Sequence, residues 1–550
     1  MKRYLAEHLS SILKEVGAGD DTALTFEKPK LEAHGNLTTN VAMTLAKSLR
    51  RNPRQVAQDI VSRLTLDPTA VSRVEIAGPG FINFWFTDAF TTRRVTEILA
   101  AGPEFGRTAA GHGRKTQVEY VSANPTGPLS VGHGRQAAIG DTIANLLSWT
   151  GHDVTREYYY NNAGRQMRKL AESTYARYRQ LYNSGFPFPE DGYQGDYIKE
   201  IAEQLKAERG EEVARLPLEQ ALDVCKSFAE QRLFQAIKNV LARMGVVHDV
   251  FFNEDSLYHN GEIENVVAEF RRMGLAYDQD GAVWLKTSSM GLEQDRVIIK
   301  STGEPTYRLP DIAYHREKFR RGFDLVVDVF GADHIATIPD VLAGIKALGY
   351  DPDKVKVVIH QFVTLMQGGE QVKMSKRLAT FVTLDELIDE VGADAVRFFF
   401  LMRSISSHLE FDMELAKEQS EKNPVYYLQY AHARIASILR FAEGEGVFAG
   451  AQALAGADTT LLTGAAEVAL AKLLLEFPDE VEATAASLEP HRLTAYLHEA
   501  ATAFHKFYHD HRVVVPEKDV AQARLALCLA TKTVLANGFK ILGITAPERM

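Results

Sequence analysis

The spacing of hydrophobic residues divides the chain into three regions. In residues 1 to about 110, apolar residues recur at helical spacing at Leu5, Leu9, Ile12 and Val16. Two more helical runs follow, separated near Pro53, and VSRVEIAGPGFINFWF then predicts two strands around Gly78-Pro79-Gly80. A glycine-rich stretch after residue 101 indicates a linker. The first region is therefore predicted to be a separate α+β domain, residues 1–110.

The middle region alternates between strand and helix patterns. In VEYVSANPTGPLSVGHGR, residues 118–135, an apolar strand runs into a turn broken by two prolines, and a helix with Ile139, Ile143 and Leu147 follows. Residues 154–160 predict a second strand, and a βαβ unit implies parallel pairing. Residues 165–250 are mostly helical and charged, which indicates an insertion. Further strands are expected at residues 282–286, 296–300, 325–330 and 354–365. Residues 111–393 are thus predicted to form an α/β domain on a parallel sheet.

From residue 394 to the end, almost every pattern is helical. Leu428, Ala431, Ile435 and Leu439 lie on one face of a helix, and long apolar-periodic runs follow at 460–475, 490–508 and 518–541. Residues 394–550 are therefore predicted to form an α-helical bundle.

Composition narrows the class of protein. The chain has 550 residues, with 45% hydrophobic and 24% charged residues, which is typical of soluble globular domains. We find no run of about 18 uncharged apolar residues, so no membrane span is expected. The two cysteines, Cys225 and Cys528, are too far apart to suggest a zinc site, and they favour a reducing cytoplasm. With a net charge of -10, any nucleic-acid surface must be a local basic patch.

Two short stretches suggest phosphate chemistry. Gly132-His133-Gly134 opens a helix directly after a strand, where backbone N–H groups and the helix dipole attract phosphate. VKMSKR, residues 372–377, places three cations on a loop that follows two glycines. A tight turn explains the first stretch equally well, and a solvated surface explains the second. Together they suit charge stabilisation at the α-phosphate of ATP.

SVGHG and KMSKR resemble the two signature motifs of class I aminoacyl-tRNA synthetases. The whole chain resembles the bacterial arginyl-tRNA synthetase family, in stretches that run nearly from end to end. These stretches are HGNLTTNVAM, AGPGFINFW, VEYVSANPTGPLSVGHGR, YYYNNAGRQM, YQGDYI, TYRLPDIAYH, GADH, VKMSKR, YYLQYAHAR and APERM. The resemblance implies a Rossmann-like catalytic domain with a helical insertion, an N-terminal domain that contacts tRNA, and an anticodon-binding α-bundle.

The resemblance also implies the reaction and the site. Arginine and ATP give arginyl-adenylate and pyrophosphate, and the arginyl group then passes to the 3′ end of tRNA-Arg. Activation is expected to require bound tRNA. The catalytic residues implied are His133, Lys373 and Lys376. The ATP-binding residues implied are Ser130, Gly132, His133, Gly134, His334, Lys373, Met374, Ser375 and Lys376. Arginine is expected to bind Glu119, Asn124, Tyr307 and Asp311, and tRNA to bind Tyr427, Tyr430 and Arg434.

The residues expected to bind arginine also suit a guanidinium by their chemistry alone. A guanidinium is a planar fork of donors, which carboxylates such as those of Glu119 and Asp311 accept best. Each residue also has an ordinary structural explanation: Glu119 as a solvent-facing strand residue, Asp311 as a helix N-cap after Pro310, and the tyrosines near 427 as packing residues. The family resemblance decides in favour of binding.

Two positions depart from the family motifs. Ser130 stands where the first motif usually has histidine, and a serine hydroxyl cannot carry positive charge. Arg377 ends the second motif in place of serine or threonine, which keeps positive charge in the loop. The His334 and Asp333 pair lies where the nucleotide contacts of the family fall.

We expect Mg²⁺ to accompany ATP, no metal held by the protein, no membrane contact, and a cytoplasmic monomer. One alternative is another class I synthetase or a nucleotidyltransferase. Another is a tRNA-binding paralogue that no longer activates amino acid, and Ser130 is the only residue that supports it.

Overall fold

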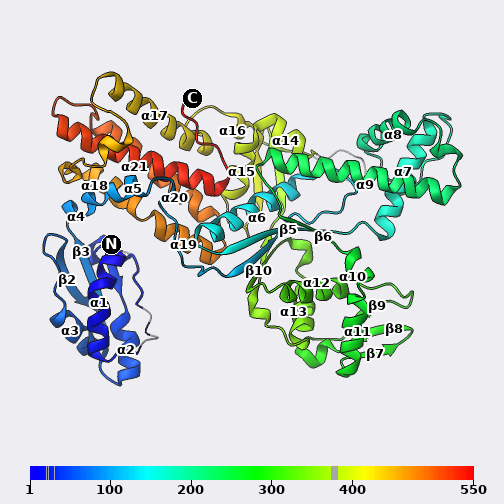
Figure 1. The fold of residues 1–550 in the computed structure, drawn as a ribbon, viewed down its shortest axis with the longest axis horizontal. Coiled ribbons are helices and arrows are strands. Elements are labelled where there is room, and N and C mark those ends of the chain that lie inside the picture. Colours follow the sequence, from blue (N-terminus) through cyan, green and yellow to red (C-terminus); the bar gives the residue numbers. More distant parts are fainter. Residues whose placement is uncertain (20–21, 23, 30, 373–381) are drawn as a thin grey trace.

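The computed structural model describes residues 1–550 except 20, 21, 23, 30 and 373–381, together with the side chain of residue 32. Figure 1 shows the parallel sheet at the centre, with the N-terminal domain and the C-terminal helices towards one end and the insertion at the other.

The N-terminal residues form a small α+β unit with its own hydrophobic core. Its helices and strands are α1 (Lys2–Val16), β1 (Leu37–Thr39), α2 (Val41–Leu49), α3 (Pro53–Arg63), β2 (Val71–Ala77) and β3 (Phe81–Phe86). The strands pair antiparallel in the order β1-β3-β2. The helical pattern breaks near Pro53 because α3 begins there, where the Asn52 side chain accepts from the backbone N–H groups of Arg54 and Gln55.

Two short helices, α4 (Asp88–Arg93) and α5 (Val95–Ala101), follow this unit and pack against C-terminal helices. On the C-terminal side, the Asn537 side-chain amide donates to the carbonyl oxygens of Gly102 and Phe105 at 3.0 and 2.9 Å. The predicted domain boundary at residue 110 therefore stays a prediction.

The central sheet has five parallel strands in the order β11-β10-β4-β5-β6. The strands are β4 (Lys115–Glu119), β5 (Asp153–Tyr160), β6 (Val250–Asn253), β10 (Leu325–Gly331) and β11 (Val355–His360). Helix α6 (Val131–Trp149) connects β4 to β5, which confirms the predicted βαβ unit. The strand order reverses between β4 and β10, and ligands bind at the carboxyl ends of the strands at such a point.

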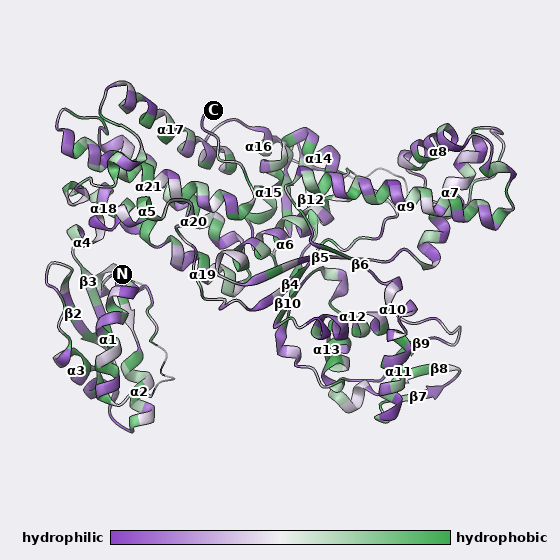
Figure 2. Cartoon of the chain, in the orientation of Figure 1, coloured by the Kyte–Doolittle hydropathy of each residue, from purple (hydrophilic) through white to green (hydrophobic). Residues whose placement is uncertain are grey.

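A helical insertion leaves the sheet between β5 and β6. Its helices are α7 (Gly164–Gln180), α8 (Asp196–Arg209) and α9 (Leu218–Arg243). Hydrophilic residues cover much of α7 and α8 (Figure 2), in keeping with an outlying position. A second group of helices and strands packs on the face of the sheet opposite α6 and has its own hydrophobic core. It comprises α10 (Asp255–His259), α11 (Glu262–Arg272), β7 (Ala276–Gln279), β8 (Ala282–Leu285), β9 (Arg296–Ile299), α12 (Arg308–Arg320) and α13 (Ile338–Ala347).

The single strand predicted for residues 354–365 is wrong. The chain forms two strands there, β11, which pairs with β10, and β12 (Val363–Gln367), which pairs with β13 (Glu370–Gln371) and β14 (Leu409–Asp412). The apolar pattern continues through the break, but the hydrogen-bonding partners change. Arg135 of α6 stabilises the junction between β11 and β12, because its Nη1 donates to the Gln361 carbonyl oxygen at 2.7 Å.

The C-terminal region is helical, as predicted, apart from the strand β14. Its helices are α14 (Leu384–Val391), α15 (Ala393–Leu401), α16 (Met413–Lys417), α17 (Pro424–Gly444), α18 (Ala465–Leu475), α19 (Phe477–Ser487), α20 (His491–Asp510) and α21 (Lys518–Leu542). Thr383 and Glu386 form a capping box at the start of α14. One hydrophobic core runs from the sheet through α6 into this bundle.

Helix α21 is long and apolar enough to cross a bilayer. However, 72% of its most apolar 18-residue stretch is buried inside the protein, as in a core helix.

Candidate active site

The carboxyl ends of β4 and β10 bring the predicted site residues to the point where the strand order reverses. Glu119 is the last residue of β4, and its side chain is buried. Its Oε2 accepts from Lys318 Nζ at 2.6 Å, and its Oε1 accepts from Ser122 Oγ at 2.9 Å. Glu119 is therefore not the solvent-facing strand residue that the sequence left open.

The backbone after Glu119 is strained. Val121 and Ser122 have φ of 71° and 44°, in the left-handed region that residues with a Cβ seldom adopt, and valine least of all. Several hydrogen bonds hold this turn. Ser122 Oγ accepts from the Tyr159 N–H at 3.2 Å, and Tyr158 Oη donates to the Ala123 carbonyl oxygen at 2.7 Å. Strain kept in place by hydrogen bonds from a neighbouring strand is typical of a functional turn.

Asp311 lies in the first turn of α12 and faces the same site. It is half-buried and forms no ion pair with any residue that the structure describes. Burial, with the Glu119 and Glu254 carboxylates nearby, raises the pKa of Asp311 to about 7, against the lowering effect of His315 and Lys318. Tyr307, the N-cap residue of α12, is 83% exposed, so its ring is open to contact.

Sequence reasoning missed Glu254, which follows β6. Its carboxylate is buried and accepts from Tyr159 Oη at 2.6 Å and from Asn161 Nδ2 at 2.7 Å. Among the described residues it has no cationic partner. The one signal in the sequence was an acidic residue directly after a short apolar strand. Burial and the charges of Glu254, Asp311 and Glu119 together raise the pKa of Tyr159 well above its usual range.

Asn124 joins the site to the insertion. Its Oδ1 accepts from the Asn161 backbone N–H at 2.9 Å, and its Nδ2 donates to Gln166 Oε1 at 3.0 Å. Tyr197 of α8 donates to the Thr126 carbonyl oxygen at 3.0 Å. The loop between β4 and α6 is thus held by residues of the insertion.

The N-terminus of α6 carries the first predicted phosphate motif. Ser130 is the N-cap residue, and its backbone N–H donates to His133 Nδ1 at 3.1 Å. Ser130 Oγ also lies 3.2 Å from that nitrogen, so the serine hydroxyl helps to orient the His133 ring. A Cβ at Gly132 would meet no atom closer than 3.7 Å, whereas one at Gly134 would clash with Leu384 at 2.5 Å. Gly134 therefore permits close packing of α6 against α14, and a nucleotide could contact Gly134 only through its backbone.

Lys373, Met374, Ser375, Lys376 and Arg377 lie outside the described residues. The described chain on either side places the ends of this segment. Before it, the Val372 N–H donates to the Leu365 carbonyl oxygen at 2.9 Å. After it, Thr383 forms a bridge with Ser130, and the Leu384 N–H donates to the Leu129 carbonyl oxygen at 2.9 Å. The described chain that follows KMSKR thus begins directly beside the N-terminus of α6.

His334 lies in a 3₁₀ turn, Ala332–His334, that follows β10. Its ring stacks on Phe330 with ring centroids 4.9 Å apart, and its side chain is 52% exposed. It lies at the carboxyl end of β10, where ligands bind in sheets of this kind.

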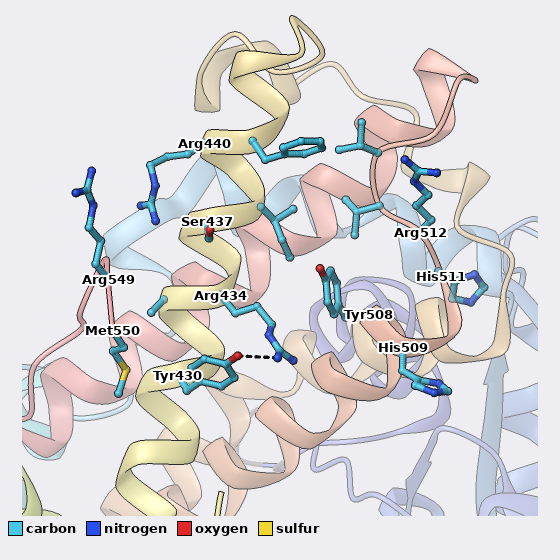
Figure 3. Close-up of a pocket in the computed structure, with 15 residues that line it drawn as sticks. Tyr430, Arg434, Ser437, Arg440, Tyr508, His509, His511, Arg512, Arg549 and Met550 are labelled. Carbon is cyan, nitrogen blue, oxygen red and sulfur yellow. Dashed lines mark hydrogen bonds between the residues drawn. The ribbon is translucent and has the colours of Figure 1, made fainter. Parts of the chain in front are cut away.

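A cavity of about 900 Å³ lies in the C-terminal bundle, between α17, α20 and the chain end (Figure 3). Tyr430 and Arg434 line it, whereas Tyr427 does not and packs against His498 and His505. Arg434 Nη2 donates to Tyr430 Oη at 2.8 Å, and its guanidinium lies 4.6 Å from the Tyr430 ring centroid. The other basic residues that line the cavity are Arg440, His509, His511, Arg512 and Arg549. On a chain of net charge -10, this is the local basic patch that nucleic-acid binding would require.

Comparison with protein families matches three successive parts of the chain. Residues 3–86 match the arginyl tRNA synthetase N terminal domain, residues 94–399 the catalytic domain of tRNA synthetases class I (R), and residues 428–550 the DALR anticodon binding domain.

Whole-chain relatives agree. The arginine–tRNA ligase of Desulfotalea psychrophila is 53% identical over 96% of this chain and 94% of its own length. That of Salinibacter ruber is 49% identical over the whole of both chains. The solved structure of Thermus thermophilus arginyl-tRNA synthetase superposes with a TM-score of 0.76 over the whole of both chains at 24% identity, which is a likeness of fold.

Proposed function

The chain belongs to the arginyl-tRNA synthetase family and is an arginine–tRNA ligase, and from this premise we propose how its residues carry out the reaction. In the first step, an oxygen of the arginine carboxylate attacks the α-phosphorus of ATP. The bond to the bridging oxygen breaks, and pyrophosphate leaves. In the second step, a hydroxyl of the 3′-terminal ribose of tRNA attacks the carbonyl carbon of arginyl-adenylate, and AMP leaves.

Arginine selection is assigned to the acidic cluster of Glu119, Asp311 and Glu254. One observation carries this assignment: these three carboxylates are buried or half-buried, and Lys318 is the one cation among the described residues that pairs with any of them. A guanidinium would supply the missing charge with directed hydrogen bonds. Tyr307 would cover its flat face, and Asn124 would contact the rest of the substrate. Neutral citrulline would leave buried carboxylates unpaired.

ATP is assigned to the N-terminus of α6 and to KMSKR. The free backbone N–H groups around Gly132 suit phosphate oxygens, and His133, held by Ser130, would donate through its other ring nitrogen. Lys373 and Lys376 would stabilise the charge that develops on the leaving pyrophosphate. Gly134, His334, Met374 and Ser375 complete the proposed nucleotide site. Mg²⁺ would enter bound to the ATP phosphates.

Arginine-dependent ATP–pyrophosphate exchange, with and without tRNA-Arg, tests this function. Exchange that appears only with tRNA supports the proposed mechanism and shows that Ser130 is tolerated. Tight tRNA binding with no exchange would instead identify a non-catalytic paralogue, which the comparisons do not favour.

The raised pKa of Asp311 leads to a pH prediction. The pKa of about 7 in the free enzyme means that this carboxyl is largely protonated below neutral pH. A neutral carboxyl is a poor partner for a guanidinium, so arginine must displace a proton to bind. We expect the KM for arginine to rise by roughly tenfold per pH unit below about pH 7 and to level off above about pH 8.

Exchange assays with saturating ATP and tRNA measure this dependence. The Asp311→Asn variant serves as the control, because its arginine KM should lose most of the dependence. A wild-type KM that stays constant from about pH 6 to about pH 8 would contradict the assignment.

The tRNA is assigned to the C-terminal cavity (Figure 3), where single-stranded anticodon bases would stack on Tyr430 and Tyr508. Arg434 lies over both rings, at 4.6 and 5.4 Å from their centroids, and is already oriented. Tyr427, outside the cavity, would act through its packing on His505.

The predicted domain limits, 1–110, 111–393 and 394–550, and a cytoplasmic monomer without membrane contact remain part of the proposal.

Arg434→Ala is expected to raise the KM for tRNA-Arg in aminoacylation by about tenfold, because a preoriented cation contributes roughly 1–3 kcal/mol to a base contact. The arginine KM should stay unchanged. Arg492→Ala removes one positive charge from the same bundle at an exposed ion pair with Glu480, and it should have little effect. Equal tRNA affinity in wild type and Arg434→Ala would remove Arg434 from the interface.

A further inference from the structure

Three carboxylates stand side by side across the middle of the parallel sheet. Asp328 on β10 and Glu157 on β5 are both register partners of Glu119 on β4, so the three occupy one level of neighbouring strands. All three side chains are buried. Like charges on adjacent strands repel each other, and a buried carboxylate without a partner is costly. This row of acids therefore requires cations.

Helix α12 and the residue after it supply those cations. Lys318 is fully buried, and its Nζ donates to Glu119 Oε2 at 2.6 Å and to Asp328 Oδ1 at 2.7 Å. Arg321 donates to both oxygens of Glu157 at 2.6 and 2.8 Å. Glu157 thus has a cation of its own, whereas Glu119 and Asp328 share one ammonium.

The two carboxylates that share Lys318 do not depend on it equally. Asp328 also accepts from His315 Nε2 at 2.9 Å. The second partner of Glu119 is a neutral hydroxyl, that of Ser122. Although burial disfavours the ammonium, the Asp328 and Glu119 carboxylates raise the pKa of Lys318, so it stays charged. The other titratable groups close to Glu119 are Asp311 and Tyr314 on α12, Glu157 and Tyr159 on β5, and Glu254.

We propose that Lys318 is a positioning residue for arginine selection: its ammonium holds Oε2 of Glu119, so that the remaining acceptor positions of this carboxylate meet the guanidinium. This inference rests on the proposed role of Glu119 in binding arginine. Lys318 lies seven residues after Asp311, two helical turns along one face of α12, so one helix carries a direct arginine ligand and the residue that prepares another.

The test replaces Lys318 by Met, which keeps the length of the side chain and removes the charge. Glu119 and Asp328 then face each other without a shared cation, and Glu119, which lacks a second ionic partner, is no longer held at Oε2. In exchange assays with tRNA-Arg, we expect Lys318→Met to raise the KM for L-arginine by about tenfold while the kcat at saturating arginine falls by less than about threefold.

A double-mutant cycle separates this role from a purely structural one. In the Glu119→Gln background, Lys318→Met should change the arginine KM by less than about twofold, because the carboxylate that it prepares is gone. Arg321→Met is the matched control: it removes a half-buried cation from the same row of acids, and it should leave the arginine KM within about twofold of wild type. Should Lys318→Met not fold, Lys318→Met with Asp328→Asn restores the charge balance and carries the same KM expectation.

The outcomes distinguish this inference from the proposed function. If Glu119→Gln leaves the arginine KM unchanged, the binding role of Glu119 fails and this inference fails with it. If Glu119→Gln raises the KM but Lys318→Met does not, the inference alone fails. It is also overturned if Lys318→Met raises the KM equally with and without the Glu119 carboxylate.

Discussion

Replacing Asp311 by Asn is expected to raise the KM for arginine by about 100-fold and to change kcat by no more than about threefold. Truncating one member of a desolvated ion pair costs roughly 2–5 kcal/mol, and asparagine keeps one acceptor oxygen, so an effect of about 3 kcal/mol is reasonable. Asp311 forms no ion pair with any residue that the structure describes, and burial raises its pKa to about 7. Its charge is therefore available to the substrate alone.

Steady-state exchange over a range of arginine concentrations, with tRNA-Arg present, measures this effect. Asp385→Asn is the matched control, because Asp385 is also a first-turn aspartate, on α14, but pairs with Arg243 at the surface. An unchanged arginine KM in Asp311→Asn would remove Asp311 from the site. A lower kcat at constant KM would move it from binding to chemistry.

Lys376→Ala is expected to lower kcat for adenylate formation by about 100- to 1000-fold and to leave the arginine KM within about threefold. A lysine that stabilises charge on the leaving pyrophosphate contributes mainly in the transition state, where removing one such group costs roughly 3–4 kcal/mol. Lys376 lies outside the described residues, but Thr383, shortly after it, pairs with Ser130 at the N-terminus of α6.

Single-turnover formation of arginyl-adenylate, followed by rapid quenching, isolates this step. Arg377→Ala is the control within the same motif. It removes one positive charge from a position where the family usually has serine or threonine, so its effect should stay within about threefold. An increase in KM without loss of kcat for Lys376→Ala would contradict a transition-state role.

Local patterns in the sequence predicted the secondary structure well where the signals are themselves local. The break at Pro53 and the buried stripe of Leu428, Ile435 and Leu439 both depend on residues within about three turns of one another. The strand at 354–365 failed because alternation of apolar residues does not reveal which strand will be the partner.

The candidate site was predicted only in part. Glu119, Asp311 and His133 were named from motifs, and the structure places them around the carboxyl ends of β4 and β10. Glu254 and Lys318 were not named, since neither belongs to a recognisable local motif. They come to the site through pairing of β5 with β6 and packing of α12 on the sheet.

The sequence by itself determined the family, the order of the elements and the identity of most proposed ligands, because caps, periodicity and compound motifs act over short distances along the chain. Only the tertiary structure decided that Asp328, Glu119 and Glu157 share one level of the sheet, that Lys318 joins two of them, and that burial raises the pKa of Asp311 to about 7. Charge interactions and desolvation depend on distances in space and on burial, and residues about 200 positions apart meet only after the chain has folded.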